Sequence, residues 1–410
     1  MAEMKRIAVI GGGASGLMAA YAAAKNGALV TLYEKNEKLG KKIYITGKGR
    51  CNLTNDCLPD EFLQNVVHGE KFLMGAIWSF PPLRIMEFME SHGLALKTER
   101  GNRVFPVSDH ASDVTKTLEM ACKEAGVNIV LNAKVEKIDI LQGTMRGIII
   151  KNQAIIYDGV IVATGGLSYP STGSTGDGYN FAQFCGHKIV PPVPSLTGLN
   201  LAGDYTSIQG ISLKNVVLTA IYKGKTISSR MGELLFTHYG ISGPLVLSLS
   251  AEVNRVPIKE ISLYLDFKPA LDDKKLDARL LRDFAERKNE TIKNVARSLL
   301  PNHLVQHLLK KAGIGFDKKV NSITKEERGT LIKMLKKFPL IPVSLRGFDE
   351  SIVTSGGISL NEVHPKTMES KLIKGLFFCG EVLDVDAFTG GFNMQIAFST
   401  GYLAGEGASK

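Results

Sequence analysis

Three glycines near the N-terminus have the spacing of a phosphate-binding loop. Gly11, Gly13 and Gly16 follow an apolar strand predicted at 5–10 and open an alanine-rich helix predicted at about 14–26. In such a turn the first glycine permits the tight bend and the second lets a pyrophosphate approach the helix N-terminus. The third glycine allows the helix to pack closely on the strand. The motif therefore predicts a site for a dinucleotide.

An acid at the end of the next predicted strand, 28–33, extends this site. Glu34 comes 21 residues after Gly13, where a carboxylate can accept hydrogen bonds from ribose hydroxyls. A negative side chain there argues against a 2′-phosphate on that ribose. This unit alone fits NAD or FAD, so other segments must decide between them.

Two further glycine-rich segments favour a flavin. A basic loop at 40–55 follows the first βαβ unit directly, and Gly380 and Glu381 end a predicted strand far along the chain. An acid in that position can bind a ribityl hydroxyl. The pair Gly390–Gly391 opens a predicted C-terminal helix, whose N–H groups and positive end can face the N1/C2 edge of a flavin. The alternative is two unrelated turns.

Composition excludes several classes of protein. The chain has 410 residues, of which 44% are hydrophobic and 22% charged, as in a globular protein of two or three domains. No apolar run approaches the roughly 20 residues of a membrane helix, and the first residues lack the core of a signal peptide. Five cysteines without a Cys-x-x-Cys pair indicate a reducing, cytoplasmic setting. No metal site is predicted, because His303 and His307 lack the glutamate of a zinc-protease motif.

Shifts in composition divide the chain. We expect a nucleotide-binding domain from 1–190 and 346–410, a β-rich segment at 191–270 and a basic helical segment at 271–345. Within the last, residues 291–340 hold eleven Lys/Arg against three Asp/Glu, a net charge of 11 − 3 = +8. Such a block suits a polyanionic partner, although a solvated helical face explains it as well.

Longer segments resemble those of a known family. The chain is similar to the HI0933-like, or YhiN-like (BaiN-like), bacterial flavoproteins, themselves similar to glutathione-reductase-type folds, at residues 40–55, 163–176, 235–244, 354–358, 367–371 and 380–393. The resemblance spans nearly the whole chain. It implies an α/β fold in which a Rossmann-like (glutathione-reductase-type) FAD-binding domain is split by a β-rich plus helical insert domain.

The resemblance also implies which residues hold FAD. They fall in four groups along the chain: Gly11, Gly13, Ala14, Ser15, Gly16, Glu34 and Lys35; Lys42, Thr46, Gly47, Gly49, Arg50, Cys51 and Asn52; Val135, Ala163, Thr164 and Gly165; and Gly380, Glu381, Asp384, Gly390, Gly391, Phe392 and Asn393.

Proteins of this type carry out different reactions, so the resemblance leaves the substrate open. Some reduce an activated C=C bond, either in a uridine of ribosomal RNA or in a small enone such as a bile-acid intermediate. Flavin N5 then delivers hydride to the β-carbon and an acid protonates the α-carbon, with NAD(P)H expected as a transient donor. Another similar protein is an aminoacetone-type amine oxidase, and a flavin-bearing RNA-binding factor without turnover is the non-enzymatic alternative.

The basic segment favours RNA among these substrates, because phosphate contacts from Lys and Arg dominate affinity for nucleic acid. The lysines expected to make these contacts are Lys310, Lys311, Lys318, Lys319, Lys336 and Lys337.

Two residues are candidates for the catalytic acid. Cys51 lies beside Arg50 in the basic loop, where a positive neighbour can activate a thiol. His238 lies in the β-rich segment and can donate a proton near neutral pH. A packing role for the cysteine and a structural role for the histidine are the alternatives.

Overall fold

The computed structural model describes residues 4–410, which form two compact units. Unit 1 comprises the chain up to Ser195 together with Gly347–Lys410, and unit 2 comprises Leu196–Arg346. The chain thus leaves unit 1 five residues after the expected boundary at 190 and returns one residue after 346. Unit 1 is assembled from both ends of the sequence.

A parallel five-stranded sheet forms the centre of unit 1. Its order is β21-β11-β1-β2-β7, and every neighbouring pair is parallel. The inner strands are buried on both faces, which explains their continuous apolar sequences. The strands are β1 (Arg6–Ile10), β2 (Leu29–Tyr33), β7 (Asn128–Val130), β11 (Gly159–Val162) and β21 (Leu376–Phe378).

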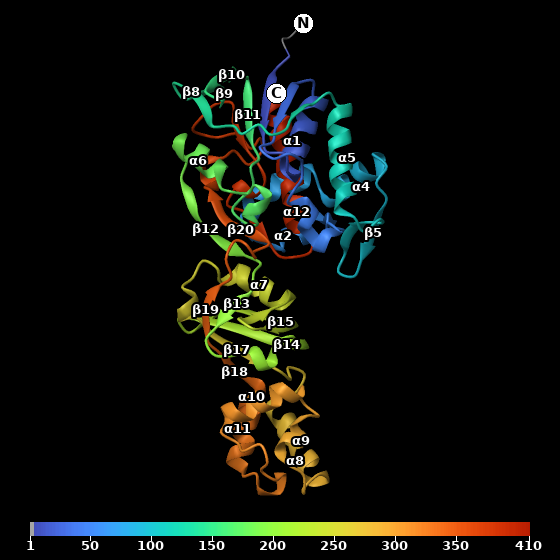
Figure 1. Cartoon of the computed structure of the whole chain (residues 1–410), viewed down its shortest axis with the longest axis vertical. Helices are drawn as coiled ribbons and strands as arrows, with labels where there is room; N and C mark the ends of the chain where they lie inside the picture. Colours follow the sequence, from blue (N-terminus) through green and yellow to red (C-terminus); the bar gives the residue numbers. More distant parts are fainter. Residues whose placement is uncertain (1–3) are drawn as a thin grey trace. The chain divides into compact units, whose positions relative to one another are not determined.

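Two helices from opposite ends of the sequence pack together in unit 1. Figure 1 shows α1 (Ala14–Lys25) beside α12 (Phe392–Ser409). A Cβ atom at Gly401 would lie only 2.3 Å from the carbonyl oxygen of Ser15, so α12 approaches the backbone of α1 directly. The C-terminal helix therefore supports the glycine turn that precedes α1.

Smaller elements surround this centre. They are the helices α2 (Pro59–Leu63), α3 (Glu70–Ser79), α4 (Pro82–Ser91), α5 (Ala111–Glu124) and α6 (Asp177–Phe184), and the paired strands β3 (Thr54–Asn55), β5 (Leu96–Glu99) and β6 (Arg103–Pro106); β8 (Lys137–Leu141), β9 (Thr144–Ile150) and β10 (Gln153–Ile156); β12 (Ile189–Ser195) and β20 (Val353–Ile358); and β4 (Val66–His68) and β22 (Asp386–Ala387). Strands β5 and β6 pair as an antiparallel hairpin. A 3₁₀ segment at Ile43–Gly49 occupies part of the predicted basic loop.

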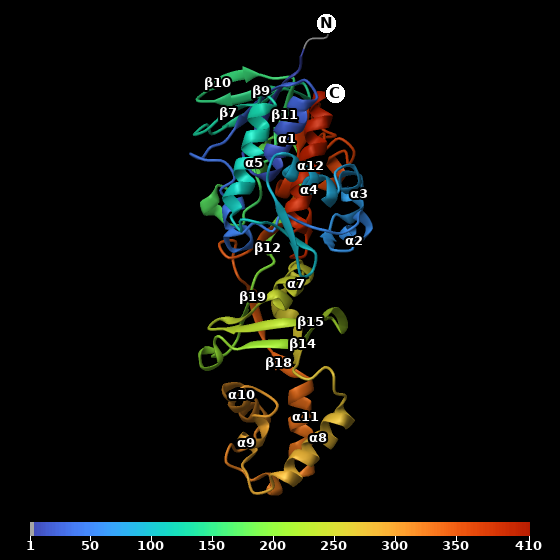
Figure 2. The same ribbon diagram turned by 90° about the vertical axis from the view of Figure 1, so that its right-hand side faces the viewer.

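Unit 2 has its own sheet and its own core. Figure 2 shows its long strands and, further along this unit, its helices. The antiparallel sheet has the order β18-β17-β14-β15-β16-β13-β19. The strands are β13 (Leu199–Leu201), β14 (Ser212–Tyr222), β15 (Lys225–Thr237), β16 (Gly240–Ser242), β17 (Ser262–Asp266), β18 (Phe338–Leu340) and β19 (Pro342–Leu345), and the helices are α7 (Pro244–Val253), α8 (Asp273–Glu286), α9 (Ile292–Ala296), α10 (Asn302–Ala312) and α11 (Lys325–Lys336).

The two parts expected within the insert are interleaved rather than consecutive. The β-rich segment contains helix α7, which packs on β15. Residues 338–345, expected to be helical, form β18 and β19 and complete the sheet by pairing with β17 and β13. Both short strands contain proline, which weakens a strand pattern read from sequence alone. None of the helices among residues 4–410 combines the length and apolar character needed to cross a membrane.

Candidate functional site

The predicted phosphate-binding turn lies between β1 and α1. A Cβ atom at Gly16 would lie 1.8 Å from the carbonyl oxygen of Gly11, so only glycine allows this close approach. A Cβ atom at Gly13 would have no other atom within 4 Å, so open space faces the backbone there. No side chain among the described residues caps α1. The first N–H groups of a helix have no partner within the helix, so those of Ala14 and Ser15 can donate to a phosphate.

The acid predicted for the ribose is fixed beside this turn. Glu34 is 8% exposed, and one oxygen accepts a hydrogen bond of 2.7 Å from the backbone N–H of Gly12. Its other oxygen accepts bonds from the backbone and side chain of Asn36. Since each carboxylate oxygen can accept more than one bond, the carboxylate retains capacity for a ribose hydroxyl.

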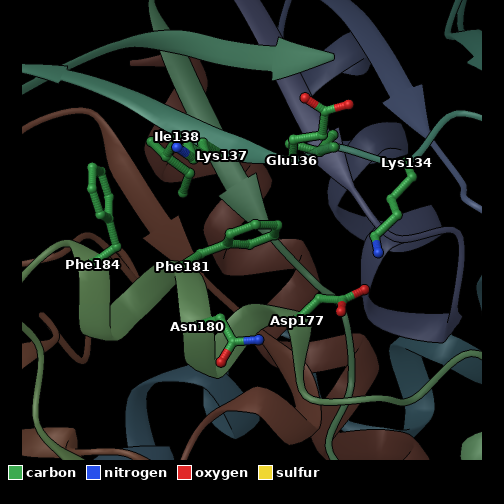
Figure 3. Close-up of a pocket in the computed structure, with 9 residues that line it drawn as sticks. Lys134, Glu136, Lys137, Ile138, Asp177, Asn180, Phe181 and Phe184 are labelled. Carbon is green, nitrogen blue, oxygen red and sulfur yellow. The ribbon is translucent and has the colours of Figure 1, made fainter. Parts of the chain in front are cut away.

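A cleft lies close to Glu34 and Lys35, and Figure 3 shows the residues that line it. The backbone N–H of Ala133 donates to the carbonyl oxygen of Glu34, and Lys35 Nζ lies 2.7 Å from Asp177 Oδ2 on the cleft wall. The cleft has a volume of about 290 Å³ and is lined by Lys134, Val135, Glu136, Lys137, Ile138, Asp177, Asn180, Phe181 and Phe184. Its position beside Glu34 and its aromatic wall suit an adenine ring. Val135 is one of the lining residues, and its contact with FAD stays a prediction.

The ends of two neighbouring strands meet at a partly buried ion pair. Ala163, Thr164 and Gly165 follow β11, and Gly380 and Glu381 follow β21 directly alongside it. The Glu381 carboxylate accepts hydrogen bonds from Lys42 Nζ at 2.5 Å, from Ser168 Oγ at 2.7 Å and from the Thr354 backbone N–H at 2.8 Å. Burial raises the pKa of Glu381, but the lysine and these donors together hold the pKa below its ordinary value. The Glu381 carboxylate thus joins the basic loop to the ends of β11 and β21. The backbone of Glu381, rather than its side chain, is therefore available to a ligand.

The N-terminus of α12 adjoins the basic loop. Gly391 has φ +100°, and a Cβ atom there would lie 2.3 Å from the Thr54 backbone. The Asn52 amide, with its oxygen toward Gly391, accepts from that residue's N–H at 2.9 Å, and Asn55 Nδ2 donates to the Gly390 carbonyl at 3.0 Å. Asn393 in turn bonds both backbone groups of Ala387. Segments predicted to contact a flavin from both ends of the chain thus lie together.

These features fit FAD. The open space at Gly13 and the uncapped start of α1 suit the pyrophosphate, Glu34 suits the ribose, and the cleft at Val135 suits the adenine. The start of α12 is a second helix N-terminus without a side-chain cap, which suits the electron-rich edge of the flavin ring. Residues 46–52 lie against that end through Asn52.

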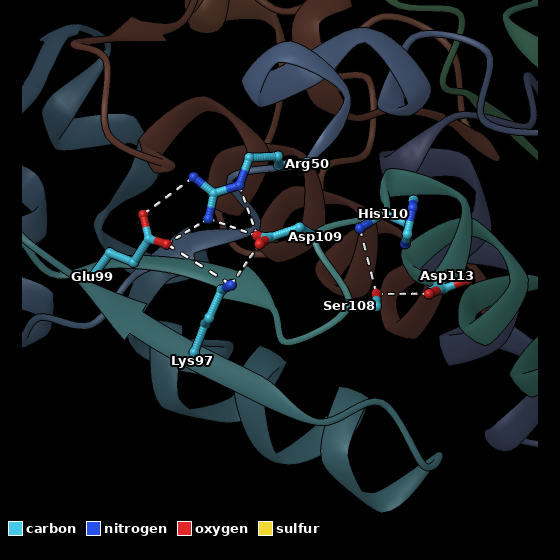
Figure 4. A network of polar contacts seen from close by, with 7 residues as sticks. All are labelled: Arg50, Lys97, Glu99, Ser108, Asp109, His110 and Asp113. Carbon is cyan, nitrogen blue, oxygen red and sulfur yellow. Dashed lines mark hydrogen bonds and ion pairs between the residues drawn. The ribbon is translucent and has the colours of Figure 1, made fainter.

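Arg50 is the member of the basic loop that pairs with two acids. Figure 4 shows its guanidinium turned toward Glu99 and Asp109, which also pair with Lys97. The Arg50 guanidinium also lies over the Phe105 ring, 4.2 Å from its centroid. Hydrogen bonds from Lys97 and Arg50 lower the pKa of Asp109, and the bond from Arg50 lowers that of Glu99. Two nearby carboxylates therefore hold this guanidinium, and the contact of Arg50 with FAD stays a prediction.

The two candidate acids lie in unlike environments. The Cys51 side chain is fully buried, and burial raises the pKa of its thiol to about 12. A thiol with no exposed surface cannot reach a substrate, so the predicted catalytic role of Cys51 is wrong and packing explains the residue. His238 is exposed in the tight turn between β15 and β16 of unit 2, and its role as an acid stays a prediction.

A polar cluster that the motifs did not reveal lies in unit 1. His68 Nδ1 is 2.6 Å from Asp386 Oδ1, and the Asp386 side chain is completely buried. The two residues are 318 positions apart and meet because β4 pairs with β22. No local spacing could have linked them, although Asp384-Val-Asp386 just before the glycine pair was a visible signal.

The six lysines predicted to bind RNA divide into two groups. Lys318 and Lys336 form ion pairs with Glu327 and Asp266, and Lys311 Nζ donates to the Pro339 carbonyl while burial lowers its pKa. These three are committed within unit 2, contrary to prediction, because acids and carbonyls of the same unit lie within reach. Lys310, Lys319 and Lys337 are exposed, and so is Lys311 although it bonds the Pro339 carbonyl.

Comparison with known proteins gives consistent results. Residues 5–407 match the model of the HI0933-like protein Rossmann domain. A 3-dehydro-bile acid delta(4,6)-reductase of Clostridium scindens is 33% identical, covering 99% of this chain and 100% of that protein. A ribosomal RNA dihydrouridine synthase of Haemophilus influenzae is 31% identical, covering 98% of each chain. The solved structure of a 3-ketosteroid-delta4-(5alpha)-dehydrogenase of Rhodococcus jostii has a TM-score of 0.54 at 16% identity, covering 100% of this chain and 98% of the other, which shows a shared fold.

Proposed function

Since the chain belongs to the HI0933-like family and is an FAD-dependent oxidoreductase, we propose that it reduces an activated C=C bond at the expense of NAD(P)H. Support comes from the two full-length relatives described above, whose names both denote saturation of such a bond. When bound and reduced, FAD supplies the hydride for this reaction. The protein must supply the proton, the orientation of the substrate and the exclusion of water.

The proposal assigns the binding of FAD to residues that are already positioned. The N–H groups at Gly13 and the start of α1 would hold the pyrophosphate, and Glu34 would hold the ribose. The start of α12 would face the flavin ring. The Lys42–Glu381 pair would keep the basic loop against the strand ends, because it joins segments 339 residues apart.

We propose a uridine of ribosomal RNA as the leading substrate. The observation that carries this choice is the exposed basic surface of the helical part of unit 2, where Lys310, Lys319 and Lys337 are joined by exposed Lys325 and Lys333. Phosphate contacts from such side chains supply much of the affinity for RNA. A small neutral substrate gains nothing from them.

A small enone is the second candidate. It is favoured by the identity to the bile-acid reductase, which is slightly higher than that to the dihydrouridine synthase. A compact conjugated carbonyl compound would undergo the same chemistry, so the two candidates differ in recognition and not in mechanism.

Ribosomal RNA from a strain that lacks this gene separates the candidates. The purified protein, reduced with NADPH, is mixed with that RNA or with a 3-oxo-4,6-diene bile acid, and dihydrouridine or the saturated steroid is measured by mass spectrometry. We expect dihydrouridine to form in the RNA. Formation of the saturated steroid alone would establish the second candidate, and peroxide formed from aminoacetone without NADPH would overturn C=C reduction.

A further inference from the structure

One buried carboxylate of unit 1 has no part in the FAD contacts described above. Asp386 is completely inaccessible to solvent. Its Oδ1 lies 2.6 Å from His68 Nδ1 and accepts a bond of 3.1 Å from Ser355 Oγ, and its Oδ2 accepts a bond of 2.8 Å from Ser195 Oγ. Four separate strands, β4, β12, β20 and β22, each contribute one of these residues. A buried charge needs such compensation, and one histidine and two serines supply it here.

The arrangement fixes the orientation of the His68 ring. A carboxylate oxygen can only accept, so Nδ1 carries the proton in this bond and Nε2 is the atom left for another partner. The His68 side chain is 24% exposed, whereas that of Asp386 is not exposed at all. The histidine is therefore the reachable end of a buried pair.

The pair lies within the segment predicted to line the flavin. Asp386 stands between Asp384 and Gly390–Gly391, all expected near the cofactor. Gly69, which follows His68, is packed on the same segment, since a Cβ atom there would lie 2.7 Å from a methyl group of Val385 and 3.4 Å from the carbonyl oxygen of Asp384. His68 thus lies across from the residues that lead directly into α12.

We propose that His68 is the proton donor of the reaction and that Asp386 is its positioning residue. This inference rests on the proposed function, the reduction of an activated C=C bond. It replaces Cys51, which is buried, with a histidine that is both held in place and partly exposed.

The step balances as follows in atoms and electrons. The substrate gains a hydride at its β-carbon, which breaks the π bond and leaves an enolate. The Nε2–H bond of His68 then breaks, its proton forms the new C–H bond at the α-carbon, and the imidazole is left neutral. Solvent returns the proton before the next turnover, and NAD(P)H is the reductant that the proposed function names. The Asp386 carboxylate accepts from Nδ1–H and so holds the ring in place for the transfer.

A purely structural role is separated from this one by the choice of substitution. His68→Asn places an amide N–H where Nδ1 stood, so it preserves a donor to Asp386 and removes Nε2. A structural role predicts that His68→Asn behaves as the wild type. His92→Asn is the matched control, because His92 bonds the Phe88 carbonyl through Nδ1 and lies outside this cluster.

The experiment measures the two half-reactions separately by stopped flow on the FAD-loaded protein. Enzyme reduced with NADPH is mixed anaerobically with ribosomal RNA from the gene-deletion strain, with the 3-oxo-4,6-diene bile acid, or with molecular oxygen as an acceptor that needs no carbon protonation. In His68→Asn we expect reoxidation by the organic acceptor that serves the wild type to slow at least a hundredfold, the scale of general acid catalysis. The rates of reduction by NADPH and of reoxidation by oxygen should stay within about twofold of the wild-type rates, because neither step needs the general acid.

The outcomes are distinct. Unchanged reoxidation of His68→Asn by the organic acceptor overturns the role of His68 while the proposed function stands. An equal loss in all half-reactions, or loss of bound flavin, shows that the substitution damages the cofactor site as a whole and not proton transfer, and it also overturns the role of His68. Failure of wild-type enzyme to be reoxidised by either organic acceptor overturns the proposed function and this inference with it.

A spectroscopic test needs no turnover. In the wild-type protein the Nδ1 proton of His68 should give a resonance far downfield, as expected for a short bond to a carboxylate. Asp386→Asn should shift it upfield, and Ser195→Ala should leave it in place. Absence of this resonance from wild-type protein would overturn the positioning role of Asp386.

Discussion

Units 1 and 2 hold their charged side chains in different ways. In unit 1 the carboxylates of Glu34, Glu381 and Asp386 each accept several hydrogen bonds, and each has at least one donor from a segment distant in the sequence. In unit 2 many lysines lie on the surfaces of helices, and their partners are usually a single acid or carbonyl nearby. The first arrangement fixes the position of each carboxylate, and the second leaves positive charge on the surface. Substitutions in the two units should therefore fail in different ways.

The largest expected effect is loss of the cofactor through Gly13→Asp. Because the space in front of Gly13 is open, the side chain fits without disturbing the fold, but its charge would face the pyrophosphate. Like charges held together cost several kcal/mol, so FAD affinity should fall by about a hundredfold or more. Flavin absorbance after gel filtration measures this.

Gly13→Ala is the matched control for that substitution. It fills part of the same space without charge and should retain more FAD than Gly13→Asp, with a similar Tm for the two apoproteins. Equal retention of FAD by the two variants would contradict the assignment of this turn to the pyrophosphate.

The second effect concerns stability within unit 1. Glu381→Gln removes the charged partner of Lys42. The side chain of Lys42 is 22% exposed and that of Glu381 is 19% exposed. Breaking a fully buried pair costs about 3–5 kcal/mol, and the partial exposure here brings the expected cost to about 2–3 kcal/mol of unfolding free energy. Urea denaturation at neutral pH measures it, and a loss near zero would show that the pair does not hold the loop.

The same pair predicts a dependence on pH. The pKa of Glu381 is lowered in the folded protein, so its contribution is present above the unfolded carboxyl pKa of about 4.3 and is lost as pH falls through the folded value. Wild-type protein should therefore lose more unfolding free energy than Glu381→Gln between neutral pH and the acid range. Parallel curves would contradict this sign.

The third effect concerns substitutions in unit 2, which should change the affinity for RNA alone. Replacing Lys310, Lys319 and Lys337 with alanine should weaken RNA binding by about tenfold at moderate salt and reduce the slope of log affinity against log salt by about three. Activity toward a small enone should not change. Replacing three exposed lysines of unit 1 is the matched control, namely Lys25, Lys71 and Lys151. Equal effects of the two triple variants would remove the basis for RNA as substrate.

The smallest effect is expected at the surface network of Arg50. Glu99→Gln removes one partner of an exposed cluster, and exposed ion pairs contribute little because water and salt screen them. A small drop in Tm at low salt should disappear at high salt. A drop that persists at high salt would show that the network does more than neutralise surface charge.

The sequence predicted best what the backbone dictates. The G-x-G-x-x-G turn and the glycine pair at 390–391 encode conformations that few other residues allow, so strand, helix and site followed from spacing. Side-chain partnerships were harder to predict. Nothing local showed that Arg50 would turn to Glu99 or that Lys336 would pair with Asp266, because these contacts depend on tertiary packing. The pairing of His68 with Asp386 required strands from opposite ends of the chain to meet.

Anaerobic titration of the purified protein with NADPH and NADH, followed by absorption spectroscopy, tests the central claim most directly. We predict that the protein carries a flavin band that a nicotinamide bleaches stoichiometrically and that an organic C=C acceptor restores. A flavin band that resists both donors would contradict an NAD(P)H-fed reductase, and the absence of any flavin band after FAD is added would contradict the site itself.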